Sequence, residues 1–273
     1  LFLSIMLIGS LILSIVAVVM SIYTGERAYV FTTAPIGVAT ILAITLIYHF
    51  IGLRLKRTSY RLYALILIVG FLATMARVYT LILAFAPFIL KLFKKFKAPS
   101  LFLAMFAFSM LFTFVLIEFM DVLRPRSIEA DNIRGIGRLF DVEIWKFALY
   151  GRAESYLSAL GSFLDHPLVG IGLFKGEHTI TEHNFHIEWL IYGGLIGYTI
   201  YIVLFLSHVI TVNRHLRKYK DNDPILLAGL VALMAILLNS VTNGFMHGLM
   251  PLSAFIVMGI SEARIGLRER GSI

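Results

Sequence analysis

The chain has 273 residues, of which 59% are hydrophobic and only 15% charged, and its formal net charge is +8 at pH 7. This balance excludes an ordinary soluble domain, which carries more charge and less apolar surface. The absence of cysteine excludes disulfides, thiolate nucleophiles and cysteine metal sites. Because the basic residues sit mostly in short loops between apolar runs, the positive charge indicates membrane orientation and not nucleic-acid binding.

The apolar runs approach the roughly 20 residues that a helix needs to cross a bilayer, so the sequence predicts an all-α fold, a polytopic bundle of transmembrane helices. About eight spans are expected, at residues 1–23, 34–53, 62–76, 77–93, 99–120, 186–212, 224–242 and 247–262. The chain opens at Leu1, inside an apolar run, which predicts that earlier helices of a longer protein precede it.

Clusters of Arg and Lys follow every second span. They are the loops 54–61, 91–97 and 213–220 and the tail "ARIGLRER". If every span crosses, all four lie on one side, which the positive-inside rule identifies as the cytoplasm. The predicted division is therefore transmembrane helices in 1–120, an extracytoplasmic loop in 121–185, and the last three helices with a cytoplasmic tail in 186–273.

The long outer loop is expected to contain amphipathic helices, because the stretch "YGRAESYLSALGSFLDHP" carries apolar residues at helical spacing. They are Tyr156, Ala159, Leu160, Phe163 and Leu164. The helix should end at Asp165 or His166, before Pro167. Two glycines, Gly170 and Gly172, predict a flexible turn after it.

A further pattern begins at the end of this loop: His183 and Asn184, then Gly194 after nine residues, then Gly197 after two more. This spacing resembles the O-antigen ligase and O-antigen polymerase superfamily. A second element of the resemblance is Arg, three residues, an aromatic, Ala-Leu and a Pro-Leu-x-Gly-x-Gly turn. The matching residues are Arg152, Tyr156, Ala159, Leu160, Pro167, Leu168, Gly170 and Gly172.

A third element is an arginine between two closely spaced helices, which here is Arg77. The serine that usually precedes it in this family is replaced by Ala76. The resemblance implies a metal-independent glycosyltransferase without cofactors, active on the extracytoplasmic face of the bacterial inner membrane. Its donor would be a glycan on undecaprenyl diphosphate, and its acceptor a hydroxyl of another glycan or of the lipid A core. Its partners would also include membrane lipids but no nucleic acid.

The chemistry of that reaction matches residues of the predicted outer face. Departure of a lipid diphosphate develops negative charge, which arginine binds with a planar fork of donors. Arg77 and Arg152 are the candidates for this contact. A base of near-neutral pKa must accept the proton of the acceptor hydroxyl, and His183 is the candidate, with Asn184 orienting it or the sugar.

Three alternatives remain open from the sequence. A metal site is one, because donor residues gather around the motif: His178, Glu182, His183, His186 and Glu188. The spacing matches no zinc pattern. A transporter or flippase of lipid-linked glycans is a second, although ionisable residues near mid-membrane are few. Within the enzyme hypothesis, ligase and polymerase are not distinguished, because the sequence does not identify the acceptor.

Overall fold

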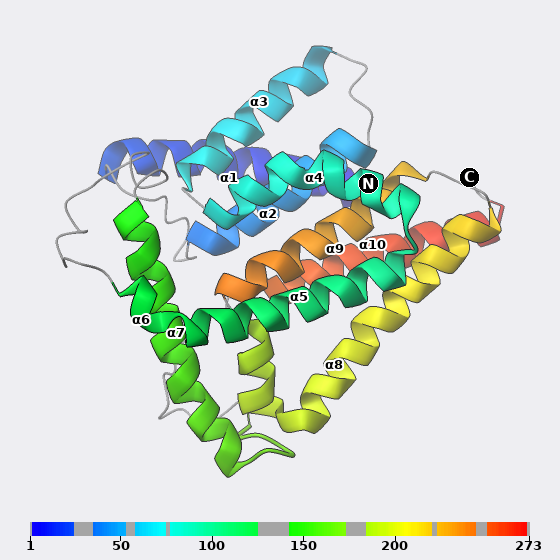
Figure 1. Ribbon diagram of the computed structural model, residues 1–273. Coiled ribbons are helices and arrows are strands. Elements are labelled where there is room, and N and C mark those ends of the chain that lie inside the picture. Colours follow the sequence, from blue (N-terminus) through cyan, green and yellow to red (C-terminus); the bar gives the residue numbers. More distant parts are fainter. Residues whose placement is uncertain are drawn as a thin grey trace. The chain divides into compact units, whose positions relative to one another are not determined.

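The computed structural model describes residues 2–24, 35–52, 58–74, 77–124, 142–172, 184–219, 223–243 and 250–271. These residues form helices and short turns without any β-strand, so the predicted all-α fold is confirmed for this part of the chain (Figure 1). The helices are α1 (Phe2–Thr24), α2 (Pro35–Ile47), the π-helical turn η1 (Tyr48–Gly52), α3 (Thr58–Ala73), α4 (Arg77–Lys95), α5 (Ala98–Glu118), α6 (Met120–Leu123), α7 (Val142–Asp165), α8 (Phe185–Lys218), α9 (Pro224–Asn243) and α10 (Met250–Glu269).

Each of the eight apolar segments predicted from the sequence coincides with a helix or with a helix and its continuation. Among the described residues, three helices are long and apolar enough to cross a membrane: Met6–Tyr23, Ala98–Glu118 and Phe185–Lys218. Shorter apolar helices cover Val38–Ile51, Arg61–Ala73, Tyr79–Phe93 and Pro224–Asn239. The structure is therefore compatible with a membrane protein, while the count of eight crossings and the outer position of the loop stay predictions.

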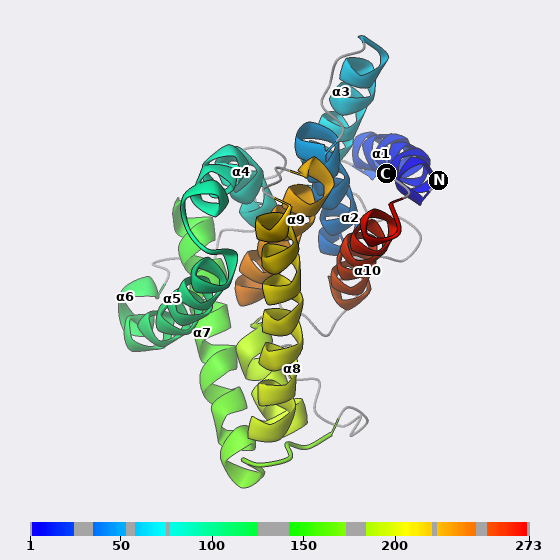
Figure 2. The ribbon, with the colours of Figure 1, turned by 90° about the vertical axis from the view of Figure 1, so that its right-hand side faces the viewer.

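The chain forms two compact units, and each combines segments far apart in sequence. Unit 1 comprises Leu1–Leu101, Val209–Ile236 and Gly248–Ile273, and unit 2 comprises Phe102–His208 and Leu237–His247. Figures 1 and 2 show the helices of each from two directions. The division into 1–120, 121–185 and 186–273 concerns membrane topology, and it remains a prediction.

Unit 1 packs its apolar helices through small side chains. Gly70 of α3 lies directly against Ser14 of α1, so that a Cβ atom at position 70 would overlap that serine. Ser10 and Thr45 join α1 to α2 by a hydrogen bond of 2.7 Å between their hydroxyl oxygens. Small residues let helix backbones approach closely in an apolar medium, where lipid offers no hydrophobic driving force for helix association.

One carboxylate organises the ends of α9 and α10 in unit 1. Asp223 is fully buried, and its Oδ1 accepts hydrogen bonds from the backbone N–H groups of Ile225 (2.8 Å) and Leu226 (3.2 Å), which caps α9. Its Oδ2 accepts from Nε of Arg264 at 2.9 Å and lies 3.0 Å from Nε of Arg268. The charge is thus buried with partners on both oxygens, as burial of an ion requires.

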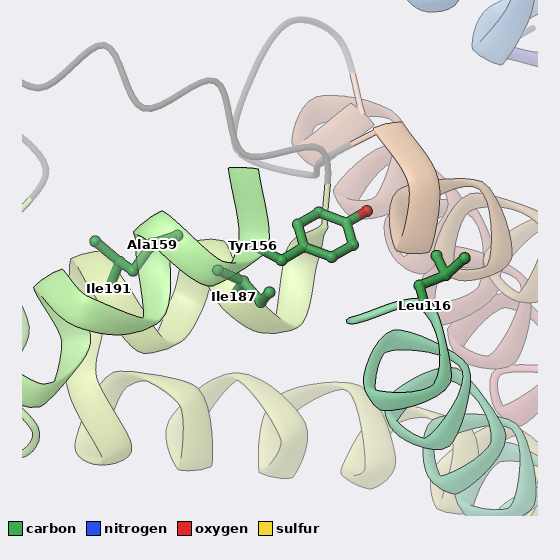
Figure 3. Packing of buried hydrophobic residues seen from close by; sticks show 5 residues of the cluster. All are labelled: Leu116, Tyr156, Ala159, Ile187 and Ile191. Carbon is green, nitrogen blue, oxygen red and sulfur yellow. The ribbon is translucent and has the colours of Figure 1, made fainter. Parts of the chain in front are cut away.

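Unit 2 has a small apolar core where three helices meet. Figure 3 shows its members, which are Tyr156 and Ala159 from α7, Ile187 and Ile191 from α8, and Leu116 from α5. The predicted end of the loop helix is confirmed, because α7 ends at Asp165.

The apolar face of α7 is narrower than the sequence suggested. Tyr156 and Ala159 are fully buried, whereas Leu160 and Leu164 are exposed. The spacing alone could not separate a buried stripe from its apolar margin, because helical neighbours on the edge of a stripe share its periodicity.

Candidate functional site

The segment from Asn184 to Gly197 does not form one straight helix. Gly194 has φ 60° and ψ −166°, which lies outside the helical region. The rings of Trp189 and Tyr201 stack with their centroids 4.6 Å apart, although the two residues are twelve positions apart in the sequence. Twelve residues of straight helix would separate them by about 18 Å. Residues 185–193 therefore fold back along the segment that begins at 195, and the predicted span 186–212 is interrupted at Gly194 (Figure 1).

The turn after α7 is joined to this bend by backbone hydrogen bonds. Its two glycines have the positive φ values expected of a turn, 68° at Gly170 and 78° at Gly172. Backbone hydrogen bonds join the two segments: Ile171 N to Ile191 O (2.7 Å), Gly172 N to Tyr192 O (3.1 Å), Leu195 N to Pro167 O (2.9 Å) and Ile196 N to Leu168 O (3.1 Å).

This contact between the turn at 167–172 and the bend at Gly194, the interlock, is possible because two residues at its centre are glycines and have no side chain. A Cβ atom on Gly194 would overlap the backbone carbonyl of Leu168, and one on Gly170 would overlap the backbone carbonyl oxygen of Ile191. Both overlaps involve main-chain atoms, which cannot move aside as a flexible side chain can. The glycines of two separate sequence motifs therefore share one structural requirement, namely close contact between two backbone segments.

Asn184 begins the bent helix and is completely buried. Its Oδ1 accepts from the backbone N–H of His186 at 2.9 Å and, more weakly, from that of Ile187 at 3.4 Å. Its Nδ2 donates to Oγ1 of Thr113 on α5 at 2.7 Å. Asn184 is thus the N-cap of α8 and ties the start of that helix to α5.

His186 connects three helical segments inside unit 2. Its Nε2 contacts the hydroxyl of Ser109 on α5, and its Nδ1 lies 2.7 Å from the hydroxyl of Tyr198 beyond the bend. Ser109 already donates to the carbonyl oxygen of Phe106 at 2.9 Å, so it accepts from Nε2–H, and Tyr198 then donates to Nδ1. A neutral imidazole protonated at Nε2 satisfies both ring nitrogens, and the Tyr198 hydroxyl, whose other acceptor is Sδ of Met110 at 3.7 Å, gives its single proton to Nδ1 at the shorter distance.

Charged groups surround the hydroxyl of Tyr156 on α7. Burial raises the pKa of Tyr156 well above its usual range, while the positive charge of Arg152 and a side-chain hydrogen bond with Asn184 act in the opposite direction. The buried carboxylate of Glu188 also acts on this hydroxyl and raises its pKa. Arg152 is only partly buried, and its charge acts on the same tyrosine hydroxyl that Asn184 contacts.

The structure brings together only part of the predicted site. Asn184 and Arg152 both belong to unit 2 and share Tyr156 as a neighbour. Arg77 is the first residue of α4, in unit 1, and its side chain lies outside the described part of the structure, as does His183 entirely. The predicted roles of His183 and Arg77 therefore remain predictions.

Two residues of the suggested metal site, His186 and Glu188, are not available as free ligands. Both ring nitrogens of His186 are engaged with hydroxyl groups, and Glu188 lies completely buried near Tyr156. In the described residues, no group of three or more His, Asp and Glu side chains could hold a metal ion. His178, Glu182 and His183 lie outside the described residues.

The sequence did not point to Ser109, Thr113 and Tyr198, which complete the buried network. Ser109 and Thr113 are the two polar residues of the apolar run "FAFSMLFTFVL", Tyr198 lies in the apolar segment "LIGYTIYIV", and none of the three belongs to a motif. The available signal was their type, since a hydroxyl inside a membrane helix needs a partner within the protein.

Comparison with known proteins leaves the family open. No protein-family model matches the sequence. No curated protein matches it either.

Proposed function

We propose that this chain is a membrane glycosyltransferase of the O-antigen ligase or polymerase type, which transfers a glycan from undecaprenyl diphosphate to an acceptor sugar hydroxyl without a metal or cofactor. The observation that carries the proposal is the interlock between the turn at 167–172 and the bend at Gly194. These are the glycine-containing parts of two motifs of the resemblance. Their close fit gives the pattern a common structural basis, which a chance match of spacing would lack.

In the proposed reaction, His183 accepts the proton of the acceptor hydroxyl while that oxygen attacks the anomeric carbon of the donor glycan. The bond between the anomeric carbon and the diphosphate oxygen breaks, and the diphosphate leaves with the bonding electrons. Arg77 and Arg152 bind the developing negative charge. Asn184 acts as a positioning residue, because its buried side-chain amide caps α8 and so fixes the backbone immediately after His183.

The direct test offers the purified chain a lipid-linked glycan together with a glycan or a lipid A core acceptor. We expect His183→Ala to lower the initial rate by about 10²–10⁴, which is typical for removal of a general base. His166→Ala is the matched control, because His166 is an exposed histidine at the end of α7. A His183→Ala enzyme within threefold of the parent would exclude this role. The acceptor that is consumed distinguishes ligase from polymerase.

The arginine contacts have a sharper test in Arg77→Lys and Arg152→Lys. Lysine keeps the charge but loses the two-pronged donor geometry, so each variant should lose roughly tenfold or more in rate. Arg61→Lys serves as a control on an exposed arginine of α3. Parental rates in both test variants would show that neither arginine makes this contact.

Membrane sidedness can be tested directly because the chain has no cysteine. Single cysteines at Ser127 and Ser59 should differ in labelling by an impermeant thiol reagent on intact cells, with Ser127→Cys labelled and Ser59→Cys protected. Equal labelling would contradict the proposed extracytoplasmic loop.

A transporter or flippase remains the second candidate, and one observation favours it. His186 and Glu188 are ionisable residues buried in an apolar helix, and such residues often mark transport pathways. Flux of a lipid-linked glycan in proteoliposomes without glycan transfer would support transport over the enzyme.

A further inference from the structure

Unit 1 contains an open apolar groove that the proposed reaction does not use. It has a volume of about 440 Å³ and is lined by residues of α2, η1, α3 and α4, among which Thr80 is the polar one. On α4 the lining runs from Thr80 to Leu90, which corresponds to about 15 Å of helix. The volume lies in the range of pockets that hold small ligands, roughly 300–1,000 Å³.

Two irregularities of the helices form the walls of this groove. The π-helical turn Tyr48–Gly52 contributes Phe50 and Ile51, and α4 contributes Pro87 from its interior. A π-helical turn interrupts regular helical packing and is often associated with function, and proline removes a backbone donor and bends its helix. Phe50, Ile51 and Pro87 therefore place both features in the lining of the groove.

On α4, the row of residues that lines the groove continues into two lysines, Lys91 and Lys95. Leu83, Pro87 and Lys91 are spaced four residues apart and therefore lie along one face of the helix. Lys91 is exposed, and so is Lys95, the next residue in the row. The sequence from Arg77 to Leu101 contains no acidic residue that could neutralise these charges. The apolar groove thus continues toward two exposed lysines, in a segment of the sequence that has no acidic residue.

We propose that this groove binds one acyl chain of an anionic phospholipid, whose phosphate contacts Lys91. The acyl chain is already in an apolar medium in the bilayer, so burying it yields no hydrophobic gain. Selectivity must therefore come from fit to the groove and from attraction between the headgroup and the lysine. This site is independent of the proposed transfer reaction, since it uses none of the residues assigned to it.

The test uses the full chain in lipid nanodiscs that contain phosphatidylglycerol with a diazirine on its acyl chain. After irradiation, we expect adducts in residues 46–51 and 83–90, and unlabelled phosphatidylglycerol should compete for them better than phosphatidylcholine. Adducts spread evenly over exposed helix faces, or equal competition by the two lipids, would overturn the proposal.

Paired variants separate the chain contact from the headgroup contact. Ala86→Phe should fill the groove and abolish the adducts, whereas Ala84→Phe, an exposed position of α4 that does not line the groove, should keep them. Lys91→Gln should weaken competition by phosphatidylglycerol roughly fivefold at low salt and leave phosphatidylcholine unchanged. Lys218→Gln, at the exposed end of α8, should have no effect.

Equal adduct yields in the two phenylalanine variants would overturn the acyl-chain assignment. A parental response to phosphatidylglycerol in Lys91→Gln would overturn the headgroup assignment. If Ala86→Phe fails to insert, competition between the two lipids in the parent chain still decides the question. Because the readout is lipid binding, a negative result for glycan transfer leaves this inference unchanged.

Discussion

Units 1 and 2 differ in how they use buried polar groups. In unit 1, Ser10 and Thr45 join two apolar helices that both remain regular at that point. In unit 2, Asn184 and His186 stabilise a backbone that leaves the helical conformation at Gly194. Irregular backbone within an apolar environment persists only where the protein itself satisfies the polar groups. A network of this kind requires more specific residues than helix packing does.

The strongest test of this comparison is the bend itself. Gly194→Val introduces a β-branched residue at φ 60° and places Cβ against the Leu168 backbone. The backbone strain alone costs about 1–3 kcal/mol, and the overlap adds to it, so we expect unit 2 to unfold or the chain to fail to accumulate. Gly197→Ala is the control, because the nearest neighbour of its Cβ is Trp189 Cε3 at 3.9 Å.

The measurement is thermal unfolding of the two variants in the same detergent, together with their level in the membrane. Equal stability of Gly194→Val and Gly197→Ala would show that the interlock is not required for the fold.

The helices were largely predictable because apolar runs and a proline mark their positions. The end of α7 at Asp165 follows from Pro167, which disfavours helix at the residue before it. The bend at Gly194 was not predictable, since "LIYGGLIGY" reads as a continuous apolar helix. Its positive φ depends on the turn at 167–172, through hydrogen bonds between residues 20 to 28 positions apart in the sequence.

The candidate site was predictable only where a motif existed. Asn184 and Arg152 were found through the resemblance, and the structure adds that Asn184 caps a helix. Ser109 and Tyr198 were missed because their importance depends on His186 lying between them. A sequence pattern reports spacing along one segment, whereas this network joins helices through a folded-back chain.

Unit 1 offers a second test at its buried carboxylate. Removing Asp223 takes away the carboxylate that contacts Arg264 and Arg268 and leaves α9 without its side-chain cap. Loss of a fully buried ion pair costs about 3–5 kcal/mol, but these arginines are partly exposed, so we expect about 2 kcal/mol for Asp223→Ala. Glu269→Ala, at the exposed end of α10, is the control. Urea unfolding of both variants checks the difference, and a loss no larger than that of Glu269→Ala would contradict it.

The same carboxylate predicts a pH dependence. Burial raises the pKa of Asp223, but hydrogen bonds from Arg264 and from the N–H groups of Leu226 and Ile225 outweigh burial and lower the pKa overall. A lowered folded-state pKa gives a stabilisation that is fully present above the unfolded value, about 3.9, and lost as the pH falls through the folded value. The parent should therefore lose more stability than Asp223→Asn between about pH 5 and the folded pKa. Parallel acid titrations of the two chains would contradict this assignment.

The hydrogen-bond network of unit 2 is tested by Tyr198→Phe. The change removes the donor to Nδ1 of His186 and leaves a buried imidazole nitrogen unsatisfied, at a cost of about 1–2 kcal/mol. Tyr219→Phe, an exposed tyrosine near the end of α8, should cost almost nothing. Reversible unfolding in mixed detergent micelles measures both. Equal stability of the two variants would show that the His186 network does not stabilise unit 2.

The smallest effect is expected for the corresponding hydroxyl contact of unit 1. Thr45 donates to the carbonyl oxygen of Ile41 at 2.9 Å, so it accepts from Ser10, and Ser10→Ala leaves the threonine still bonded. Hydrogen bonds between membrane helices are worth about 0.6 kcal/mol on average, and this loss should be of that size. Replacing both residues, with Ser10→Ala and Thr45→Val, should cost little more, because neither change strands a buried donor. The same unfolding assay decides the comparison: a Ser10→Ala loss as large as that of Tyr198→Phe would show that unit 1 depends on its polar contacts as strongly as unit 2.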